Sequence, residues 1–241
     1  MQRYFIDNCD SIVKLDKKND IYYHLTKVLR AKINDEVELC NSDGECFVYK
    51  IIYINSVEIS FFKIIRISEN NELPFRLILA VSLLKNNNFE LVLQKAVELG
   101  VSEIVAFESK RTVINSSNFS SSKIDRFKKI ILEAAQQSKR NCVPSFLCFY
   151  SLDDLKKFDC KYKLIAYEGI NDVSNHHLIN FCKKIDSDIM IIIGPEGGFS
   201  TEEVNYEIFI PVSLGKRILR AETAAISACN IIAANMESIG G

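Results

Sequence analysis

The pattern of apolar and polar positions divides the chain into two parts, and the first is rich in short strands. Glu36 to Cys40 alternates apolar and polar residues, and Ser42-Asp43-Gly44 then predicts a hairpin turn. The β-branched and aromatic runs Phe47 to Ile54 and Val57 to Ile67 predict two further strands. Before them, residues 22–30 predict a short helix or turn. Short strands at this spacing are typical of a small β-barrel.

Beyond a polar, proline-containing segment at 70–74, where we place the domain boundary, the pattern changes to strands that alternate with helices. The predicted strands are Arg76 to Leu84, Glu103 to Phe107, Tyr162 to Tyr167, Met190 to Ile193 and Val212 to Leu214. The predicted helices are Phe89 to Leu99, Ser122 to Lys139, residues 174–185 and Ala224 to Met236, and the Ser/Asn-rich stretch 115–122 predicts a flexible loop. This alternation predicts an α/β domain with a mostly parallel sheet covered on both faces.

Two glycine turns follow strands near the C-terminus. The apolar run Met190 to Ile193 stops at Gly194-Pro195-Glu196-Gly197-Gly198, and Gly215 follows the short strand that ends at Leu214. Between them, Ser200 and Glu203 have capping-box spacing and predict the start of a helix. Ligands of open α/β sheets bind beyond the carboxyl ends of the strands, so we expect the active site at these two turns.

The glycine turns exclude several common enzyme classes. They match neither the dinucleotide fingerprint G-x-G-x-x-G nor the P-loop G-x-x-x-x-G-K-[ST], and the chain has no G-x-S-x-G nucleophile elbow. Glycines allow a ligand to approach main-chain N–H and C=O groups closely, which suits an adenine or ribose edge. Each glycine taken alone is equally compatible with a plain turn.

Composition bounds the remaining possibilities. The chain has 241 residues, of which 48% are hydrophobic and 25% charged, as in globular domains. No apolar run approaches the ~20 residues that span a bilayer, and the N-terminus has no signal-peptide core, so we expect a cytoplasmic protein without membrane contact. The eight cysteines form no C-x-x-C pair and are expected to be buried thiols. The three histidines suggest no metal site.

Basic residues cluster in two places, although the net charge is -1. One place is Lys110-Arg111, and the other comprises Lys123, Arg126, Lys128, Lys129, Lys139 and Arg140. The second cluster is either a solvated helix face or a patch that contacts phosphates, and composition does not separate the two.

Several motifs resemble those of one family. GPEGGFS at 194–200 and LGKRILRAETA at 214–224 closely resemble the two C-terminal motifs of the RsmE-type ribosomal RNA small subunit methyltransferases, members of the SPOUT superfamily. Four shorter matches follow the same order: HLTKVLR at 24–30, QKAVELGV at 94–101, ESKRTV at 108–113 and EAAQQSKRNCVP at 133–144. The resemblance therefore spans nearly the whole chain.

The resemblance implies a fold and a reaction. Residues 1–70 would form a PUA-like RNA-binding β-barrel, and residues 74–241 a SPOUT methyltransferase domain with a trefoil knot and donor site at about 189–241. The protein would be a homodimer that transfers a methyl group from S-adenosylmethionine to N3 of a uridine in 16S rRNA of the 30S subunit, near the decoding centre. The alternatives are another SPOUT RNA methyltransferase, acting on a ribose 2′-hydroxyl or on tRNA, and a non-catalytic RNA-binding assembly factor.

The resemblance also implies site residues. Donor contacts are expected from Tyr167, Gly194, Pro195, Glu196, Gly197, Gly198, Leu214, Gly215, Ile218, Leu219, Arg220 and Thr223. RNA contacts are expected from Lys27, Arg30, Arg111, Arg126, Lys129 and Arg140. Arg220 is the first candidate to stabilise a uridine anion, and Glu196 or Glu222 could accept the N3 proton. Glu222 is explained better as a carboxylate that the dipole of a helix N-terminus favours than as a catalytic base.

Overall fold

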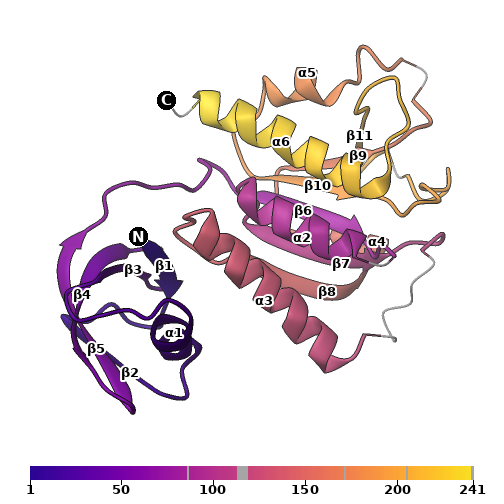
Figure 1. The fold of residues 1–241 in the computed structure, drawn as a ribbon. Helices are drawn as coiled ribbons and strands as arrows, with labels where there is room; N and C mark the ends of the chain where they lie inside the picture. The colour runs from indigo at the N-terminus through magenta and orange to yellow at the C-terminus, as the bar shows by residue number, and fades with distance from the viewer. Residues whose placement is uncertain (86, 113–118, 171, 205, 240–241) are drawn as a thin grey trace. The chain divides into compact units, whose positions relative to one another are not determined.

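The computed structural model describes residues 1–85, 87–112, 119–170, 172–204 and 206–239 (Figure 1). Residues 115–118 of the loop expected at 115–122 lie outside these residues, and residues 121–122 belong to a helix. Contacts divide the chain into two compact units: Met1–Glu72 with Ala135–Val143, and Leu73–Ala134 with Pro144–Gly241. The first unit thus includes a segment that lies well beyond residue 70 in the sequence.

The first unit is built on a curved five-stranded sheet (Figure 1). Its strands are β1 (Gln2–Phe5), β2 (Ile12–Asp16), β3 (Glu36–Cys40), β4 (Cys46–Ile54) and β5 (Glu58–Arg66), in the order β1-β3-β4-β5-β2. The β1–β3 pair is parallel and the others are antiparallel. Inward-facing residues such as Tyr49, Ile51 and Phe61 are completely buried, because they share one core with Tyr22 and Leu25 from the helical segment.

The predicted helix or turn at 22–30 consists of a short α1 (Asp20–Tyr23) that continues as a π-helix, His24–Val28. The Asn19 side chain accepts a hydrogen bond from the Ile21 N–H at 2.9 Å and caps α1. His24 Nδ1 lies 2.7 Å from the Tyr4 hydroxyl, and burial raises the pKa of Tyr4 to about 12. His24 therefore joins the helical segment to β1 and serves the core of this unit.

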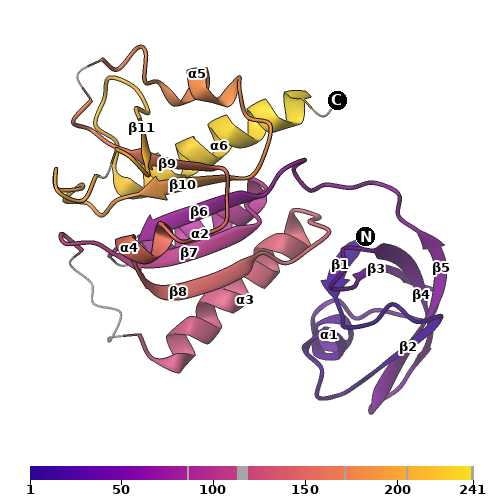
Figure 2. The same ribbon diagram turned by 180° about the vertical axis from the view of Figure 1, so that it is seen from behind.

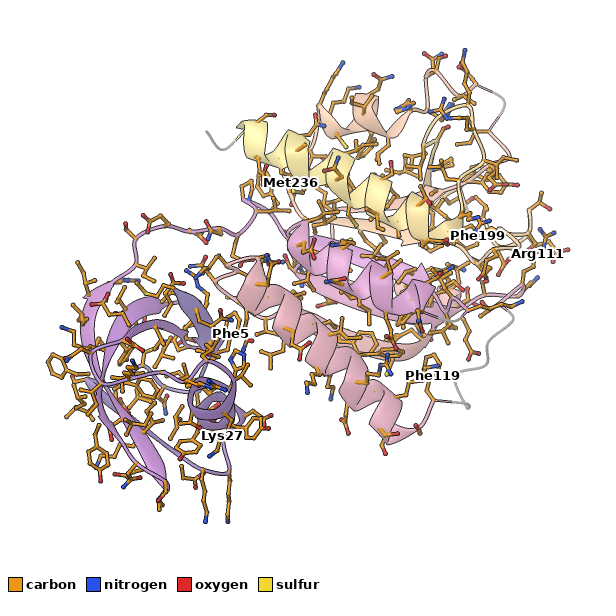
Figure 3. The ribbon with its side chains drawn as sticks, in the orientation of Figure 1. Phe5, Lys27, Arg111, Phe119, Phe199 and Met236 are labelled. Atoms are coloured by element: carbon orange, nitrogen blue, oxygen red, sulfur yellow. A yellow bond between two sulfur atoms is a disulfide. The ribbon has the colours of Figure 1, made fainter. Side chains whose placement is uncertain are left out.

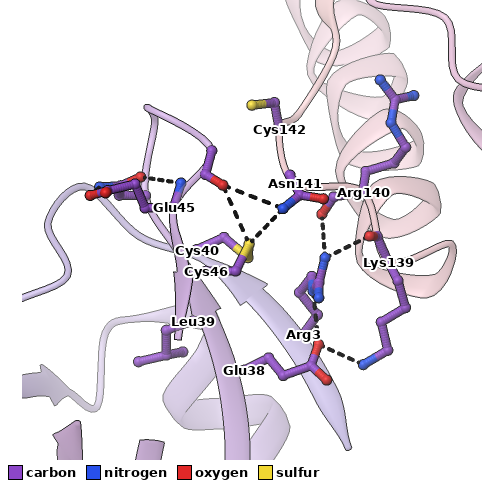
Figure 4. The surroundings of a disulfide bond; sticks show 12 residues. Arg3, Glu38, Leu39, Cys40, Glu45, Cys46, Lys139, Arg140, Asn141 and Cys142 are labelled. Atoms are coloured by element: carbon purple, nitrogen blue, oxygen red, sulfur yellow. Dashed lines mark hydrogen bonds and ion pairs between the residues drawn. A yellow bond between two sulfur atoms is a disulfide. The ribbon is translucent and has the colours of Figure 1, made fainter. Parts of the chain in front are cut away.

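The turn between β3 and β4 carries a disulfide that the sequence had not predicted. Asn41 Oδ1 accepts the Asp43 and Glu45 N–H groups at 3.1 and 2.9 Å, and Gly44 has a φ of +79°. The turn sets Cys40 opposite Cys46, and the two form a disulfide (Figure 4). The expectation that all eight cysteines are thiols is therefore wrong for this pair, since cross-strand register, and not a C-x-x-C spacing, brings the sulfurs together.

The second unit contains a six-stranded sheet in which every pairing is parallel. Its strands are β6 (Leu77–Ser82), β7 (Glu103–Glu108), β8 (Ser145–Ser151), β9 (Tyr162–Ala166), β10 (Ile189–Ile193) and β11 (Ile210–Val212), in the order β11-β9-β10-β6-β7-β8. All residues of the central strands β6 and β10 are buried, as expected for strands covered on both faces.

The two faces of this sheet are covered differently. The helices are α2 (Asn88–Glu98), α3 (Ser121–Gln137), α4 (Leu152–Leu155), α5 (Leu178–Cys182) and α6 (Ala221–Ile239). Helices α2, α3 and α6 lie on one face, and Figure 2 shows the opposite side with α4. On that side Phe199, Val204 and Phe209 pack with α4 against the sheet. Both faces are therefore covered, this one largely by a non-helical segment.

The prediction of a helix after Ser200 is wrong. Residues 201–203 form a turn, and 206–208 form another. The Glu203 carboxylate does accept hydrogen bonds from Ser200, but it also accepts the Lys110 N–H at 2.7 Å. The Ser200 N–H pairs with Glu203 as in a capping box, but the Glu203 N–H donates to the Ser200 carbonyl at 3.1 Å and closes a turn. Strand β8 and helix α4 had not been predicted, and α5 is shorter than the predicted helix at 174–185.

Candidate functional site

A cavity of about 740 Å³ lies where β9, β10 and β11 end. Its walls come from the segments that leave these three strands: Ala166–Gly169, Ile193–Phe199 and Ser213–Glu222. This is the edge of the sheet at which the sequence predicted the active site. Because the strands are parallel, their carboxyl ends meet there and bring together segments that are separated in the sequence.

The cavity collects most of the predicted donor contacts. The lining residues among them are Tyr167, Gly194, Pro195, Glu196, Gly197, Gly198, Leu214, Gly215, Ile218, Leu219 and Arg220. Thr223, the remaining one, is not a lining residue. Arg111, predicted as an RNA contact, and Asn88 and Val173, which had not been predicted, also line the cavity. Asn88 begins α2, a position that the helical periodicity alone did not connect to the glycine turns.

The first glycine turn is compact because an aromatic ring occupies the space beside it. A Cβ at Gly194 would lie 2.9 Å from the Phe199 ring, and that ring stacks on Phe107 with centroids 6.4 Å apart. The Gly198 N–H donates to the Pro195 carbonyl at 2.9 Å, and Gly198 has a φ of +66°. The main chain therefore forms this wall of the cavity, with no side chain at Gly194 between it and a ligand.

The second glycine turn is fixed by hydrogen bonds around Ser213. The Ser213 N–H donates to the His176 carbonyl at 2.8 Å, and the Leu178 N–H donates to the Ser213 carbonyl at 2.9 Å. The Gly215 N–H donates to Ser213 Oγ at 3.2 Å, and Gly215 has a φ of +127°. The Tyr167 N–H donates to the Val212 carbonyl at 3.1 Å, which ties the segment after β9 to the same wall.

Three charged candidates surround the cavity. Arg111 and Phe199 lie at the same edge of the sheet (Figure 3), and Arg111 Nη1 donates to the Gly197 carbonyl at 3.0 Å. Glu196 Oε1 accepts the Lys85 N–H at 3.3 Å. Arg220 is exposed and immediately precedes α6, where its carbonyl accepts the Ala224 N–H at 2.8 Å. Both predicted catalytic residues, Arg220 and Glu196, thus line the cavity.

The predicted RNA contacts have different surroundings. Lys129 is 73% exposed and lies 3.9 Å from Glu133, whereas Arg126 Nη2 lies 2.7 Å from Glu90. In the first unit, Lys27 and Arg30 are exposed at the end of the helical segment. All four side chains have exposed surface, as a phosphate contact requires.

Arg140 differs from these four. Its side chain is only 3% exposed, and its Nε lies 3.0 Å from both carboxylate oxygens of Glu72 (Figure 4 shows its loop). Beside it, Arg3 donates to the carbonyls of Lys139 and Arg140 at 2.5 and 3.0 Å. The basic cluster at 123–140 therefore does not act as one patch, because its last member is held in an ion pair inside the first unit.

The described residues show no cluster of three or more His, Cys, Asp or Glu side chains that could hold a metal ion. No helix in the described part of the chain is both long and apolar enough to cross a membrane.

Comparisons with known proteins identify the family of this chain. An RNA methyltransferase domain family matches residues 71–233, and an RNA methyltransferase PUA domain family matches residues 18–62. Ribosomal RNA small subunit methyltransferase E of Bacillus subtilis is 30% identical, over 100% of this chain and 99% of the relative. The enzyme of the same name from Mesomycoplasma hyopneumoniae is 34% identical, over 94% of this chain and 96% of the relative.

A solved structure of a protein from this family has a similar fold. Ribosomal RNA small subunit methyltransferase E from Neisseria gonorrhoeae, crystallised with S-adenosyl methionine, superposes with a TM-score of 0.84. It is 27% identical, and the alignment covers 99% of this chain and 98% of that one.

Proposed function

This chain belongs to the ribosomal RNA small subunit methyltransferase E family, and from that premise we propose that it methylates N3 of a uridine in 16S rRNA. The methyl donor is S-adenosylmethionine, which is bound in the solved relative. The proposed acceptor lies in the 30S subunit near the decoding centre, and we propose that the reaction takes place in the cytoplasm. A homodimer and a trefoil knot at 189–241 belong to the same proposal.

The observation that carries the proposal is the cavity formed by the segments after β9, β10 and β11. S-adenosylmethionine carries a sulfonium cation and an adenosine with several polar edges. Walls of main-chain N–H and C=O groups can pair those edges without a buried unpaired charge. The fit of these residues to the donor thus rests on backbone chemistry, and Gly194 and Gly215 keep Cβ atoms out of the wall.

The acceptor chemistry assigns a role to Arg220. Uracil N3 carries an imide proton at neutral pH, so it is a poor nucleophile until that proton leaves. A guanidinium near O2 or O4 stabilises the resulting anion. Arg220 lines the cavity at the N-terminus of α6, where the helix dipole disfavours a cation, so helix stability does not explain its presence.

We assign the proton to Glu196 in preference to Glu222. Both carboxylates line the cavity, and within the described residues the Glu196 side chain forms a hydrogen bond through Oε1 alone, to the Lys85 N–H. Its other oxygen can accept a proton from a bound base. Glu222 lies in the first turn of α6, where the dipole favours a carboxylate, and needs no catalytic role.

The test is to incubate the protein with labelled S-adenosylmethionine and 30S subunits that lack the modification, and to map the label by mass spectrometry of nucleosides. Label at uridine N3 in 16S rRNA is the expected result. Label on a ribose 2′-oxygen or on tRNA would replace this proposal by the other methyltransferase reading. Donor binding without transfer to any ribosomal particle would indicate an assembly factor.

A further inference from the structure

One carboxylate joins the loop after β7 to the glycine turn after β10. Glu203 Oε1 accepts the Lys110 N–H at 2.7 Å, and its Oε2 accepts the N–H and the hydroxyl of Ser200 at 2.9 and 3.0 Å. Both oxygens are therefore used, one toward each segment. Hydrogen bonds from backbone N–H groups to a carboxylate are stronger than neutral ones, so this bridge resists separation of the two segments.

The two residues that Glu203 joins, Lys110 and Ser200, flank a contact at the cavity wall. Arg111 follows Lys110 directly, and its guanidinium donates to the Gly197 carbonyl at 3.0 Å. A Cβ at Gly197 would lie 3.4 Å from the Arg111 Cβ, so the two segments already touch there. Arg111 and Gly197 both line the cavity. Fixing Lys110 and Ser200 therefore fixes how Arg111 lies against the glycine turn.

The loop after β7 has an internal structure of its own. Thr112 Oγ1 accepts the Ser109 N–H at 2.8 Å, and it lies 2.8 Å from Ser82 Oγ at the end of β6. The Thr112 N–H donates to the Ser109 carbonyl at 3.1 Å, which closes the turn. The turn is held to β6 without Glu203. The carboxylate therefore fixes only the position of this turn relative to the glycine turn.

The neighbouring acid provides a natural contrast. Glu202 pairs with Lys110 through the lysine Nζ at 2.6 Å, and the two side chains are 78% and 60% exposed. Such solvated pairs contribute little because water screens both charges. Of the two adjacent glutamates, only Glu203 contacts the backbone of both segments.

We infer that Glu203 is a positioning residue for methyl transfer: it holds Arg111 at the cavity wall, where the guanidinium contacts the RNA acceptor. This inference rests on the proposed function. A guanidinium has five N–H donors, and that of Arg111 uses one hydrogen bond among the described residues while its side chain is exposed. The remaining donors suit a phosphate or a uracil oxygen in planar, two-point contact.

The test variant is Glu203→Gln, which keeps the side-chain shape. One arm of the amide is an NH2 donor, so either the Lys110 N–H or the Ser200 N–H faces a donor whichever way the amide turns. We expect kcat/KM for 30S subunits to fall about tenfold, the size of effect that follows from one unsatisfied N–H. The donor Kd, measured by calorimetry, is expected to change by less than about threefold, since the glycine turn keeps its own hydrogen bond at Gly198.

A double-mutant cycle with Arg111→Ala separates positioning from general stabilisation. If Glu203 acts through Arg111, adding Glu203→Gln to Arg111→Ala lowers kcat/KM no further. Full additivity, or a Glu203→Gln enzyme within twofold of wild type, would overturn the inference. A drop in Tm that accounts for the lost activity would do the same.

Two matched controls lie in the same segments. Glu202→Gln and Lys110→Ala both remove the exposed pair, but they leave the Lys110 backbone N–H and the Glu203 carboxylate in place, so kcat/KM should stay at the wild-type value. Amide hydrogen exchange tests the hydrogen bonds of Glu203 in the absence of RNA. Glu203→Gln should raise the exchange rates of the Lys110 and Ser200 amides. If wild-type protein shows this bridge but methylates no RNA, the proposed function fails and the bridge remains structural.

Discussion

Glu72 offers the sharpest test of why the segment 139–143 joins the first unit. Its oxygens accept Arg140 Nε at 3.0 Å, the Asn141 N–H at 2.8 Å and the Cys142 N–H at 3.2 Å. The side chains of Arg140 and Glu72 are 3% and 21% exposed. The carboxylate therefore neutralises a buried guanidinium and also satisfies two backbone donors.

The change Glu72→Gln should destabilise the protein by about 3 kcal/mol at pH 7. Removing one partner of a buried ion pair costs ~3–5 kcal/mol, because a buried charge loses its counter-ion. We take the lower end, since Glu72 keeps a fifth of its surface in water. Replacing both Glu72 and Arg140 by Met should cost much less than Glu72→Gln, because no charge remains buried.

The stabilisation by Glu72 should decrease at low pH. Burial alone would raise the pKa of Glu72, but hydrogen bonds and charge from Arg140, together with the Asn141 and Cys142 N–H groups, outweigh it and leave the pKa below its ordinary value of 4.5. The stabilisation is therefore present above pH 4.5 and is lost as pH falls through the folded-state pKa. The difference in the free energy of unfolding between wild type and Glu72→Gln should therefore decrease as the pH falls below 4.5.

The measurement is urea unfolding followed by circular dichroism at pH 7 and at pH 3.5, with amide exchange of the peptide containing residues 139–143. Glu98→Gln is the control, because Glu98 pairs with Lys95 in a partly exposed (i, i+3) contact and should cost at most about 0.5 kcal/mol. A Glu72→Gln difference below about 0.5 kcal/mol at pH 7 would refute the reasoning, as would a difference that does not shrink in acid.

Three further predictions concern the cavity and the RNA. Gly194→Ala places a Cβ 2.9 Å from the Phe199 ring, so donor affinity measured by calorimetry should fall at least about tenfold, and wild-type affinity would contradict the pocket placement. Arg220→Ala should abolish methyl transfer while Tm stays unchanged, and unchanged turnover would remove Arg220 from the mechanism. Arg126→Glu with Lys129→Glu should weaken RNA binding and flatten its salt dependence, whereas an unchanged slope would mean a merely solvated helix face.

The sequence predicted those parts of the fold that depend on neighbouring residues. The five consecutive apolar residues of β10 suit only a strand buried on both faces, and every one of them is buried. Gly44 marks the β3–β4 turn because its φ of +79° is costly for other residues. The glycine turns at 194 and 215 follow parallel strands, and that local order placed them at one edge of the sheet. Both turns line the cavity, so its place in the fold was predictable as well.

The failures come from partners that are distant in the sequence. Glu203 had the spacing of a capping box with Ser200, yet it also accepts an N–H from Lys110, 93 residues away, and the chain turns where a helix was predicted. The sequence grouped Arg140 with Lys129 in a basic patch, but Glu72, 68 residues away, holds Arg140 in the first unit. Neither partnership leaves a mark in local periodicity or composition.

Distant carboxylates also determine which basic residues can serve the reaction. Arg111 and Arg140 are alike in sequence terms, since each belongs to a basic dipeptide within a motif of the family. A distant carboxylate acts on each, but in opposite ways: Glu72 takes the guanidinium of Arg140 itself, whereas Glu203 takes only the backbone beside Arg111 and leaves its guanidinium exposed at the cavity. A cation contributes to catalysis only if its donors remain for the substrate, so the placement of two carboxylates, more than the count of basic residues, selects Arg111 for the RNA acceptor.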